Sequence, residues 1–185
     1  MCSSDLLPDW RRQSIDNGHD LGHNRVQRLL AAPDGGVWIG TRSGVDRVVG
    51  EGSRARTLGT TAPIIGLARP EAPIALDDRC ALWAIGDTAL RPLPLALPAG
   101  TRCALFRAAA AGLRIVATDG TLYRTAADGR VTRAIALAQL RSGPARTTAI
   151  GRLRDGSVLL GYSDGQLVRV GDGIAPAALP FAPPT

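Results

Sequence analysis

Two histidines four residues apart are the first residues whose types and spacing could support chemistry. His19 and His23 flank Asp20, and on a helix this spacing would place two imidazoles on one face, where they could bind a metal ion. Asn17 and Gly18 before them are typical of a loop, and the glutamate of a metalloprotease motif is missing. We therefore interpret both histidines as surface polar residues, and we predict no metal site.

The three cysteines give no metal or redox motif either. Cys2, Cys80 and Cys103 contain no Cys-x-x-Cys pair, so a zinc ribbon or a thioredoxin-type site is not indicated. Cys80 and Cys103 both lie in apolar stretches. A free cysteine in such a stretch is usually a small buried hydrophobic side chain, and this is our interpretation of both.

Two glycine-containing patterns resemble parts of functional loops. The segment 50–52 (Gly-Glu-Gly) resembles a phosphate-binding loop, but no helix pattern follows it, so we interpret it as a hairpin turn. The recurring Asp-Gly pairs suit turns, and none has the dense carboxylate spacing of a calcium loop. We predict no catalytic residue and no cofactor, and the ligand-binding residues stay unknown.

Charge and hydropathy narrow the class of protein. The net charge is +6, and every one of the 22 basic residues is arginine. These arginines are spread along the chain without a dense block or interleaved aromatic residues, so a nucleic-acid-binding function is not favoured. No run of about 18 apolar residues is present, so we expect no direct membrane insertion by this segment.

A repeated pattern of short strands organises the chain. Its clearest copy contains strand-like runs at residues 26–30, 37–41, 45–49 and 54–58, separated by turns at Asp34-Gly35 and Ser43-Gly44. The last copy, from residue 149 to 179, has the same order of runs and Asp-Gly turns, and Arg169 falls on the place of Arg47. Two less regular copies lie between them. In the third, residues 108–112 stand where the others have an Asp-Gly turn.

The spacing of the copies predicts the fold. Taking Val26, Ile64, Cys103 and Thr148 as starts, the spacings are 38, 39 and 45 residues. Four-stranded units at this period are typical of propeller blades. We therefore predict an all-β fold, a partial β-propeller of about four four-stranded antiparallel blades. The expected blades are approximately 24–60, 62–97, 101–140 and 146–182, within a propeller segment 17–185.

Two further expectations concern the core and the start of the chain. Trp38, Ile115 and Leu159 are aligned at equivalent positions, and we interpret them as packing between blades and not as a platform for a ligand. Residues 1–16 are expected to be an irregular or non-native lead-in, because residues 1–6 resemble the translation of a common sequencing adapter. The low number of blades predicts that the chain is a fragment of a larger ring.

Residues 21–48 resemble the two-component regulator propeller repeat. The resemblance comprises a lead-in Asn-x-Val at residues 24–26, a Pro-Asp-Gly turn, the strand Val-Trp-Ile-Gly-Thr at residues 37–41, a Gly turn and the hydrophobic-x-Arg ending at residues 45–47. Residues 152–170 are a weaker match without the tryptophan, and the two middle units match in spacing only. The family has no shared catalytic residues.

The resemblance implies a ligand- or partner-sensing segment of a membrane-bound bacterial signal-transduction protein, of the histidine kinase or diguanylate cyclase type. It implies a periplasmic location, an unknown small-molecule or glycan ligand, other blades of the same parent chain as partners, and no catalysis in this segment. The alternative is a fragment of an enzyme propeller similar to the streptogramin lyases. Such an enzyme would need a histidine and acidic cluster at the ring centre, and both histidines here precede the first clear blade.

Overall fold

The structure, a computed structural model, describes residues 21–23, 25–49, 56–60, 62–69, 71–109, 112–143, 145–171 and 176–179. Within these residues, sixteen β-strands and one short helix follow one another along the chain. The strands form four separate antiparallel sheets of four strands each, and within each sheet neighbouring strands follow one another in the sequence. We call the four sheets blades 1 to 4. The expected lead-in, residues 1–16, lies outside the described residues.

The strand bounds are as follows. Blade 1 contains β1 (Val26–Ala31), β2 (Val37–Thr41), β3 (Gly44–Val48) and β4 (Arg56–Gly59). Blade 2 contains β5 (Ile64–Ala68), β6 (Ile74–Asp77), β7 (Leu82–Ile85) and β8 (Leu90–Leu93). Blade 3 contains β9 (Cys103–Ala109), β10 (Gly112–Ala117), β11 (Leu122–Thr125) and β12 (Val131–Ile135). Blade 4 contains β13 (Thr147–Arg152), β14 (Val158–Tyr162), β15 (Leu167–Val170) and β16 (Ala177–Leu179).

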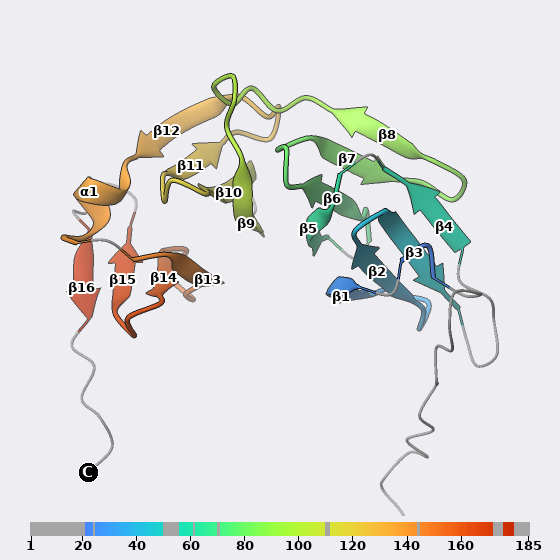
Figure 1. Cartoon of the computed structure of the whole chain (residues 1–185), viewed down its shortest axis with the longest axis horizontal. Coiled ribbons are helices and arrows are strands. Elements are labelled where there is room, and N and C mark those ends of the chain that lie inside the picture. Colours follow the sequence, from blue (N-terminus) through green and yellow to red (C-terminus); the bar gives the residue numbers. More distant parts are fainter. Residues whose placement is uncertain are drawn as a thin grey trace, which may run out of the picture.

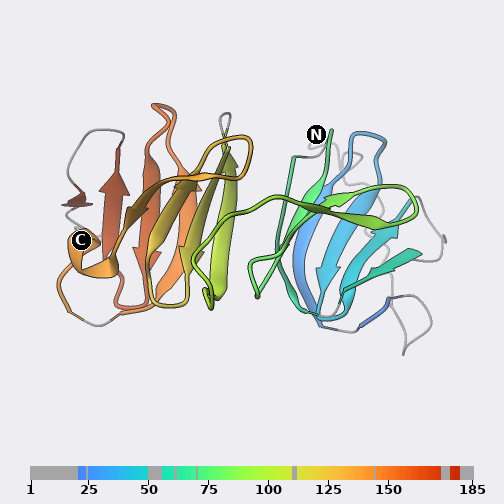
Figure 2. The same cartoon turned by 90° about the horizontal axis from the view of Figure 1, so that it is seen from above.

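The four blades stand around a common centre as an arc (Figure 1). The first strand of each blade lies on the concave side, and β8 and β12 lie on the convex side. Successive first strands contact one another, β1 with β5, β5 with β9, and β9 with β13. From above, the strands of neighbouring blades stand side by side (Figure 2). This arrangement is that of a β-propeller. The prediction of an all-β propeller segment with about four four-stranded blades is confirmed.

Apolar side chains between neighbouring blades form the core. Alternate residues of a strand point to opposite faces of the sheet, so each blade presents one apolar set to the blade before it and another to the blade after it. Val45 of blade 1 packs with Ile64 of blade 2, and Leu76 of blade 2 packs with Ile115 of blade 3. A third apolar cluster joins blades 3 and 4 in the same way. Each sheet is therefore stabilised by its neighbours.

Two glycines allow the closest approach between blades. A Cβ added to Gly66 in β5 would lie 2.0 Å from the ring of Phe106 in blade 3, and one added to Gly40 in β2 would lie 2.9 Å from Ile64 in blade 2. Neither contact leaves room for a side chain. In both places, a large side chain of the next blade's first strand rests on the glycine backbone of the blade before it.

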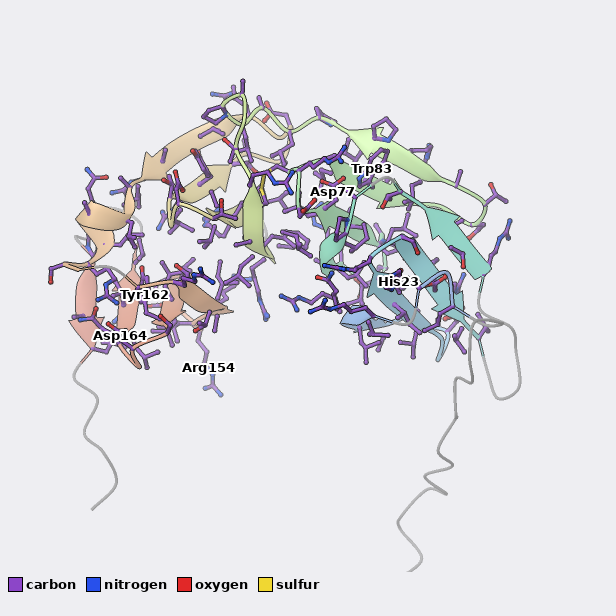
Figure 3. All side chains as sticks on the ribbon, in the orientation of Figure 1. His23, Asp77, Trp83, Arg154, Tyr162 and Asp164 are labelled. Atoms are coloured by element: carbon purple, nitrogen blue, oxygen red, sulfur yellow. A yellow bond between two sulfur atoms is a disulfide. The ribbon has the colours of Figure 1, made fainter. Side chains whose placement is uncertain are left out.

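Cys80 and Cys103 form a disulfide between blades 2 and 3, visible as a yellow bond in Figure 3. Their Cα atoms are 5.2 Å apart although the residues are 23 positions apart in the sequence. Our interpretation of them as free buried hydrophobic side chains was wrong in its chemistry, although both are buried. The β6–β7 turn of one blade meets the start of the first strand of the next, which brings the two sulfur atoms together.

A short helix follows the last strand of blade 3. The strand β12 ends at Ile135, and α1 (Leu137–Leu140) begins two residues later. The side-chain amide of Gln139 accepts a hydrogen bond from the Ala136 N–H at 3.0 Å, which caps the first turn. Leu140 is buried in the core between blades 3 and 4. Burial of this leucine turns the chain away from the sheet after Ile135.

Removing the disulfide should destabilise the fold. The double substitution Cys80→Ser and Cys103→Ser should lower the free energy of unfolding by about 3 kcal/mol, because the open chain regains the conformational entropy of the cross-linked loop. Urea unfolding of the oxidised chain and the variant measures the loss. Cys2→Ser is the control and should leave stability unchanged. Alkylation of both Cys80 and Cys103 in the unreduced, unfolded chain would contradict the disulfide.

Adding one methyl group at the close approach should also be costly. Gly66→Ala should lower the free energy of unfolding by about 1–3 kcal/mol, because the Phe106 ring must move out of its place between the blades. Gly59→Ala in β4 is the matched control, since its added Cβ would meet only the Ser43 carbonyl oxygen at 3.9 Å. Equal urea-unfolding midpoints for the two variants would refute the close packing of blades 2 and 3.

Candidate functional site

A hollow of about 550 Å³ lies on the concave side of the arc. All four blades contribute to it through their first strands β1, β5, β9 and β13. A hollow of this size is within the range of small-molecule sites, roughly 300–1,000 Å³. We call it the concave pocket.

Cationic and apolar side chains line the concave pocket. Arg28, Arg69 and Arg107 are exposed and bring positive charge from three different blades. Leu29, which is 66% exposed, adds apolar surface that no described residue covers. Among the described residues that line the pocket, none is aspartate, glutamate or histidine. These side chains can bind and orient a ligand, but they include no group with the usual pKa of a general acid or base near pH 7.

A second hollow, of about 600 Å³, lies between blades 1 and 2, and Trp38 is part of its wall. Trp38 is only 5% exposed, and the Arg47 guanidinium lies 4.6 Å from its ring centroid. Arg47 is also ion-paired with Asp34. The Arg47 guanidinium therefore covers the Trp38 ring, and the ring belongs to the core shared by blades 1 and 2. The prediction that Trp38 packs between blades is confirmed.

The strand register corrects one predicted equivalence. In blades 1 and 4, Trp38 and Leu159 each lie directly opposite an arginine of the next strand. In blade 3 the residue opposite such an arginine is Arg114, whereas Ile115 lies opposite Tyr123. The alignment of Ile115 with Trp38 and Leu159 is therefore wrong by one residue. A shift by one residue reverses the face of the sheet, so Ile115 packs towards blade 2.

Blades 1 and 4 share an arginine–aspartate pair. Arg47 in β3 binds Asp34, and Arg169 in β15 binds Asp155. Each aspartate precedes the glycine of the first hairpin turn. In blade 4, the Ser157 hydroxyl also donates to the Asp155 carboxylate at 2.6 Å and accepts a hydrogen bond from the Arg169 Nε–H at 3.1 Å. The pair connects the first hairpin to the third strand within one blade.

Blade 3 retains the arginine of this pair but not the aspartate. Arg124 in β11 occupies the arginine's place, but β9 and β10 continue until Ala109 lies opposite Gly112, so no Asp-Gly turn forms. The Arg124 guanidinium instead crosses to blade 4. There it donates to the backbone carbonyls of Val170 at 3.4 Å and Gly171 at 3.0 Å. A contact within one blade has become a contact between two.

Four arginines lie side by side across blade 3. Arg107 in β9, Arg114 in β10, Arg124 in β11 and Arg133 in β12 are direct cross-strand neighbours, and we call them the arginine row. Directly opposite residues share a face, which here is the face towards blade 4. Burial lowers the pKa of Arg124, and the charges of Arg114 and Arg133 lower it further. Burial also lowers the pKa of Arg114, with a further contribution from Arg152 in blade 4.

The other residues considered for chemistry do not converge. His23 is exposed beside blade 1, and its Nδ1 accepts a hydrogen bond from the Arg25 N–H at 2.9 Å (Figure 3). His19 and the segment 50–52 lie outside the described residues. In the part of the chain that the structure describes, no three histidine, cysteine or acidic side chains gather in a metal-binding geometry.

The buried aspartate of blade 2 holds a turn together. Asp77 is 3% exposed and lies beside Trp83 (Figure 3). Its carboxylate accepts hydrogen bonds from the N–H groups of Arg79 at 2.9 Å and Ala81 at 2.8 Å, and from the Trp83 indole N–H at 3.2 Å. These three donors satisfy the buried charge and fix the β6–β7 turn that carries Cys80.

The arginine row is the feature that sequence reasoning missed. Two parts of the signal were visible: a third copy without the Asp-Gly turn, and an arginine at Arg124 in the place of Arg47 and Arg169. Only the strand register shows that Arg107 and Arg114 continue the same line, because the extended first hairpin of blade 3 changes which residues lie opposite each other.

No family model and no curated protein matches the chain. Solved structures do match. Over 86% of this chain and 57% of the other, it is similar to YCF48 from Cyanidioschyzon merolae, with 11% identity and a TM-score of 0.62. Over 91% of this chain and 24% of the other, it is similar to the extracellular domain of BT4673 from B. thetaiotaomicron, proposed to be a one-component system, with 17% identity and a TM-score of 0.64.

A third similar structure is the N-terminal domain of Nup159, with 15% identity, a TM-score of 0.52 and coverage of 80% of this chain and 46% of the other. At these identities the likeness shows the propeller fold alone. The chain spans between about a quarter and three fifths of the structures that it matches. No described helix has the length and apolar character needed to span a membrane.

Blade 4 should lose part of its stability in acid. Hydrogen bonds from the Ser157 side chain and backbone, and then the charge of Arg169, lower the pKa of Asp155. A lowered carboxyl pKa favours the folded state above the ordinary value of about 3.9, and this stabilisation is lost as the pH falls through the lowered pKa. Asp155→Asn should therefore be less stable than the parent chain at pH 7. The difference should shrink towards pH 2.

Urea unfolding at a series of pH values from 7 to 2 measures this difference. Asp87→Asn, which changes an exposed aspartate between β7 and β8, is the control and should differ little from the parent chain at any pH. If the difference between Asp155→Asn and the parent chain were independent of pH, the aspartate would not be held in its charged form by its neighbours.

Proposed function

We propose that this chain is a ligand- or partner-sensing β-propeller segment of a membrane-bound bacterial signal-transduction protein, of the histidine kinase or diguanylate cyclase type. The concave pocket carries the proposal, because all four blades contribute to it and because it offers binding side chains without an acid–base group. The ligand is a small molecule or a glycan. The segment itself binds and does not catalyse.

Two likenesses support a sensing role. Residues 21–48 resemble the two-component regulator propeller repeat, whose members include sensor regions. The extracellular domain of BT4673, proposed to be a one-component system, has a similar fold over most of this chain. By contrast, the alternative of a lyase-like enzyme would need a histidine and acidic cluster at the centre, and the described residues of the concave pocket supply neither.

The disulfide supports a periplasmic location. Structural disulfides form and persist in oxidising compartments and are rare in the reducing cytosol. The Cys80–Cys103 bond is buried between two blades, so it acts as a structural cross-link. The likeness to an extracellular domain agrees with this location.

The outer face of blade 4 suggests further blades of the parent chain as a partner. Gly161 in β14 occupies the place of Gly40 in β2, the glycine on which Ile64 of the following blade rests. Leu159 and Leu167 flank this face and are only partly buried by the described residues. A fifth blade could rest on Gly161 as blade 2 rests on Gly40.

A ligand screen tests the proposal. Thermal unfolding of the full chain with a library of small metabolites and oligosaccharides should identify compounds that raise the midpoint. Leu29→Ser should then weaken binding of such a compound roughly tenfold, because a bound ligand covers this exposed leucine. Isothermal titration calorimetry measures the affinity.

Leu93→Ser is the matched control. Leu93 is also an exposed leucine, but it lies in β8 on the convex side, and the substitution should leave the affinity unchanged. Equal affinities for Leu29→Ser and the parent chain would place the ligand elsewhere. Separately, flanking coding sequence without a membrane helix and a kinase or cyclase domain would refute the proposed parent protein.

A further inference from the structure

Like charges meet at one end of the boundary between blades 3 and 4. Within blade 3, Arg107 lies opposite Arg114, and Arg124 lies opposite both Arg114 and Arg133. Arg152 adds a positive charge from blade 4, close enough to lower the pKa of Arg114. Directly opposite like charges in a sheet are destabilising. A protein that places five arginines together usually compensates their repulsion.

No described acidic side chain compensates Arg107, Arg114, Arg133 or Arg152. The ion pairs in the part of the chain that the structure describes each use an aspartate for an arginine elsewhere. Asp155, the turn carboxylate of blade 4, is already bound by its own blade. The missing Asp-Gly turn of blade 3 removes the carboxylate that blades 1 and 4 supply at this place.

Arg114 carries an unused donor at this boundary. Its side chain is partly buried, and one terminal nitrogen donates to the Leu113 carbonyl at 3.3 Å. Its Nε–H is buried and has no acceptor among the residues that the structure describes. A buried N–H without an acceptor costs free energy, so an acceptor placed here from outside the chain would be favourable.

We propose that the ligand of the concave pocket carries an oxyanion, a carboxylate, sulfate or phosphate group, which binds between blades 3 and 4 against Arg107, Arg114 and Arg152. Arg107 connects the proposed oxyanion site to the concave pocket, because it belongs to the arginine row and also lines the concave pocket. The inference deepens the proposed function and rests on it for the position of the rest of the ligand.

Guanidinium groups suit this task. Each offers planar, paired N–H donors that match the geometry of an oxyanion, and it stays charged at all physiological pH values. Arg124 is already held by the carbonyls of Val170 and Gly171, so it fixes the two blades at the distance that the anion would bridge. An oxyanion bound there would offset part of the positive charge of the row and connect β10 of blade 3 to β13 of blade 4.

Thermal unfolding of the full chain with sodium sulfate, phosphate or citrate tests the inference. Sodium chloride at equal ionic strength is the reference. At an anion concentration about ten times the dissociation constant, at least one of the three should raise the midpoint by roughly 2–5 °C. Concentrations below about 20 mM keep the general salting-in or salting-out effect small.

Substitutions in the row separate binding from a structural role. Arg114→Gln should abolish the rise and should leave the midpoint without anion unchanged or higher, because it removes one of the repelling charges. Arg152→Gln should act in the same direction, which keeps the test valid if Arg114→Gln fails to fold. Arg169→Gln is the matched control. It occupies the place of Arg124 in blade 4 but is paired with Asp155, so it should lower the midpoint and retain the rise.

Two results would overturn the inference: no anion-specific rise in the parent chain, or an equal rise in Arg114→Gln, Arg152→Gln and Arg169→Gln. Leu29→Ser distinguishes this failure from failure of the proposed function, because it should retain the anion response. A neutral ligand whose affinity depends on Leu29 would refute the oxyanion alone. If the parent chain responds to an anion but the screened ligands bind Leu29→Ser as tightly as the parent chain, only the proposed position of the ligand in the concave pocket would be refuted.

Discussion

The packing of sheet on sheet is the interaction on which the rest of this structure depends. A sheet of four short strands has two faces and too little surface to bury either one alone. The three apolar clusters each join neighbouring blades, and none is confined to a single sheet. Gly40 and Gly66 set the distance between blades, since a large side chain of the next blade rests on each glycine. The arc follows from repeating this contact, and the concave pocket follows from the arc.

Because the contact between blades fixes the shape, variation elsewhere in the repeat carries the information about function. In blades 1 and 4 the first hairpin holds an internal arginine–aspartate pair, in which Arg47 binds Asp34 and Arg169 binds Asp155. Blade 3 has the same strand order, yet it extends its first hairpin and loses the aspartate. Its arginine then binds backbone carbonyls of blade 4. A departure from the local pattern without an internal compensation is typical of a functional site.

Much of the fold could be predicted from the sequence because its signals are local. Hairpin turns such as Asp34-Gly35 and strand patterns such as residues 37–41 predict where chains reverse, and their spacing predicts blades. The disulfide could not be predicted in this way, since Cys80 and Cys103 become neighbours only when two blades stack. The arginine row was missed because alignment by turns placed Ile115 where the register places Arg114. Such an error of one residue is small in sequence but exchanges the two faces of a sheet.

The two blade boundaries on either side of blade 3 differ in a way that bears on the proposed sensing role. Blades 2 and 3 are joined covalently by the Cys80–Cys103 bond, so their relative position is constrained. Blades 3 and 4 share an apolar cluster, but at the arginine row their boundary is held by hydrogen bonds from Arg124 against the repulsion of like charges. A ligand shifts an equilibrium only by binding one arrangement more tightly than another. An oxyanion bound between Arg114 and Arg152 would have this differential effect, because it is attracted most strongly when the two blades are close. If the concave pocket binds a ligand as proposed, the boundary between blades 3 and 4 is therefore the place where binding would change the arrangement of the blades.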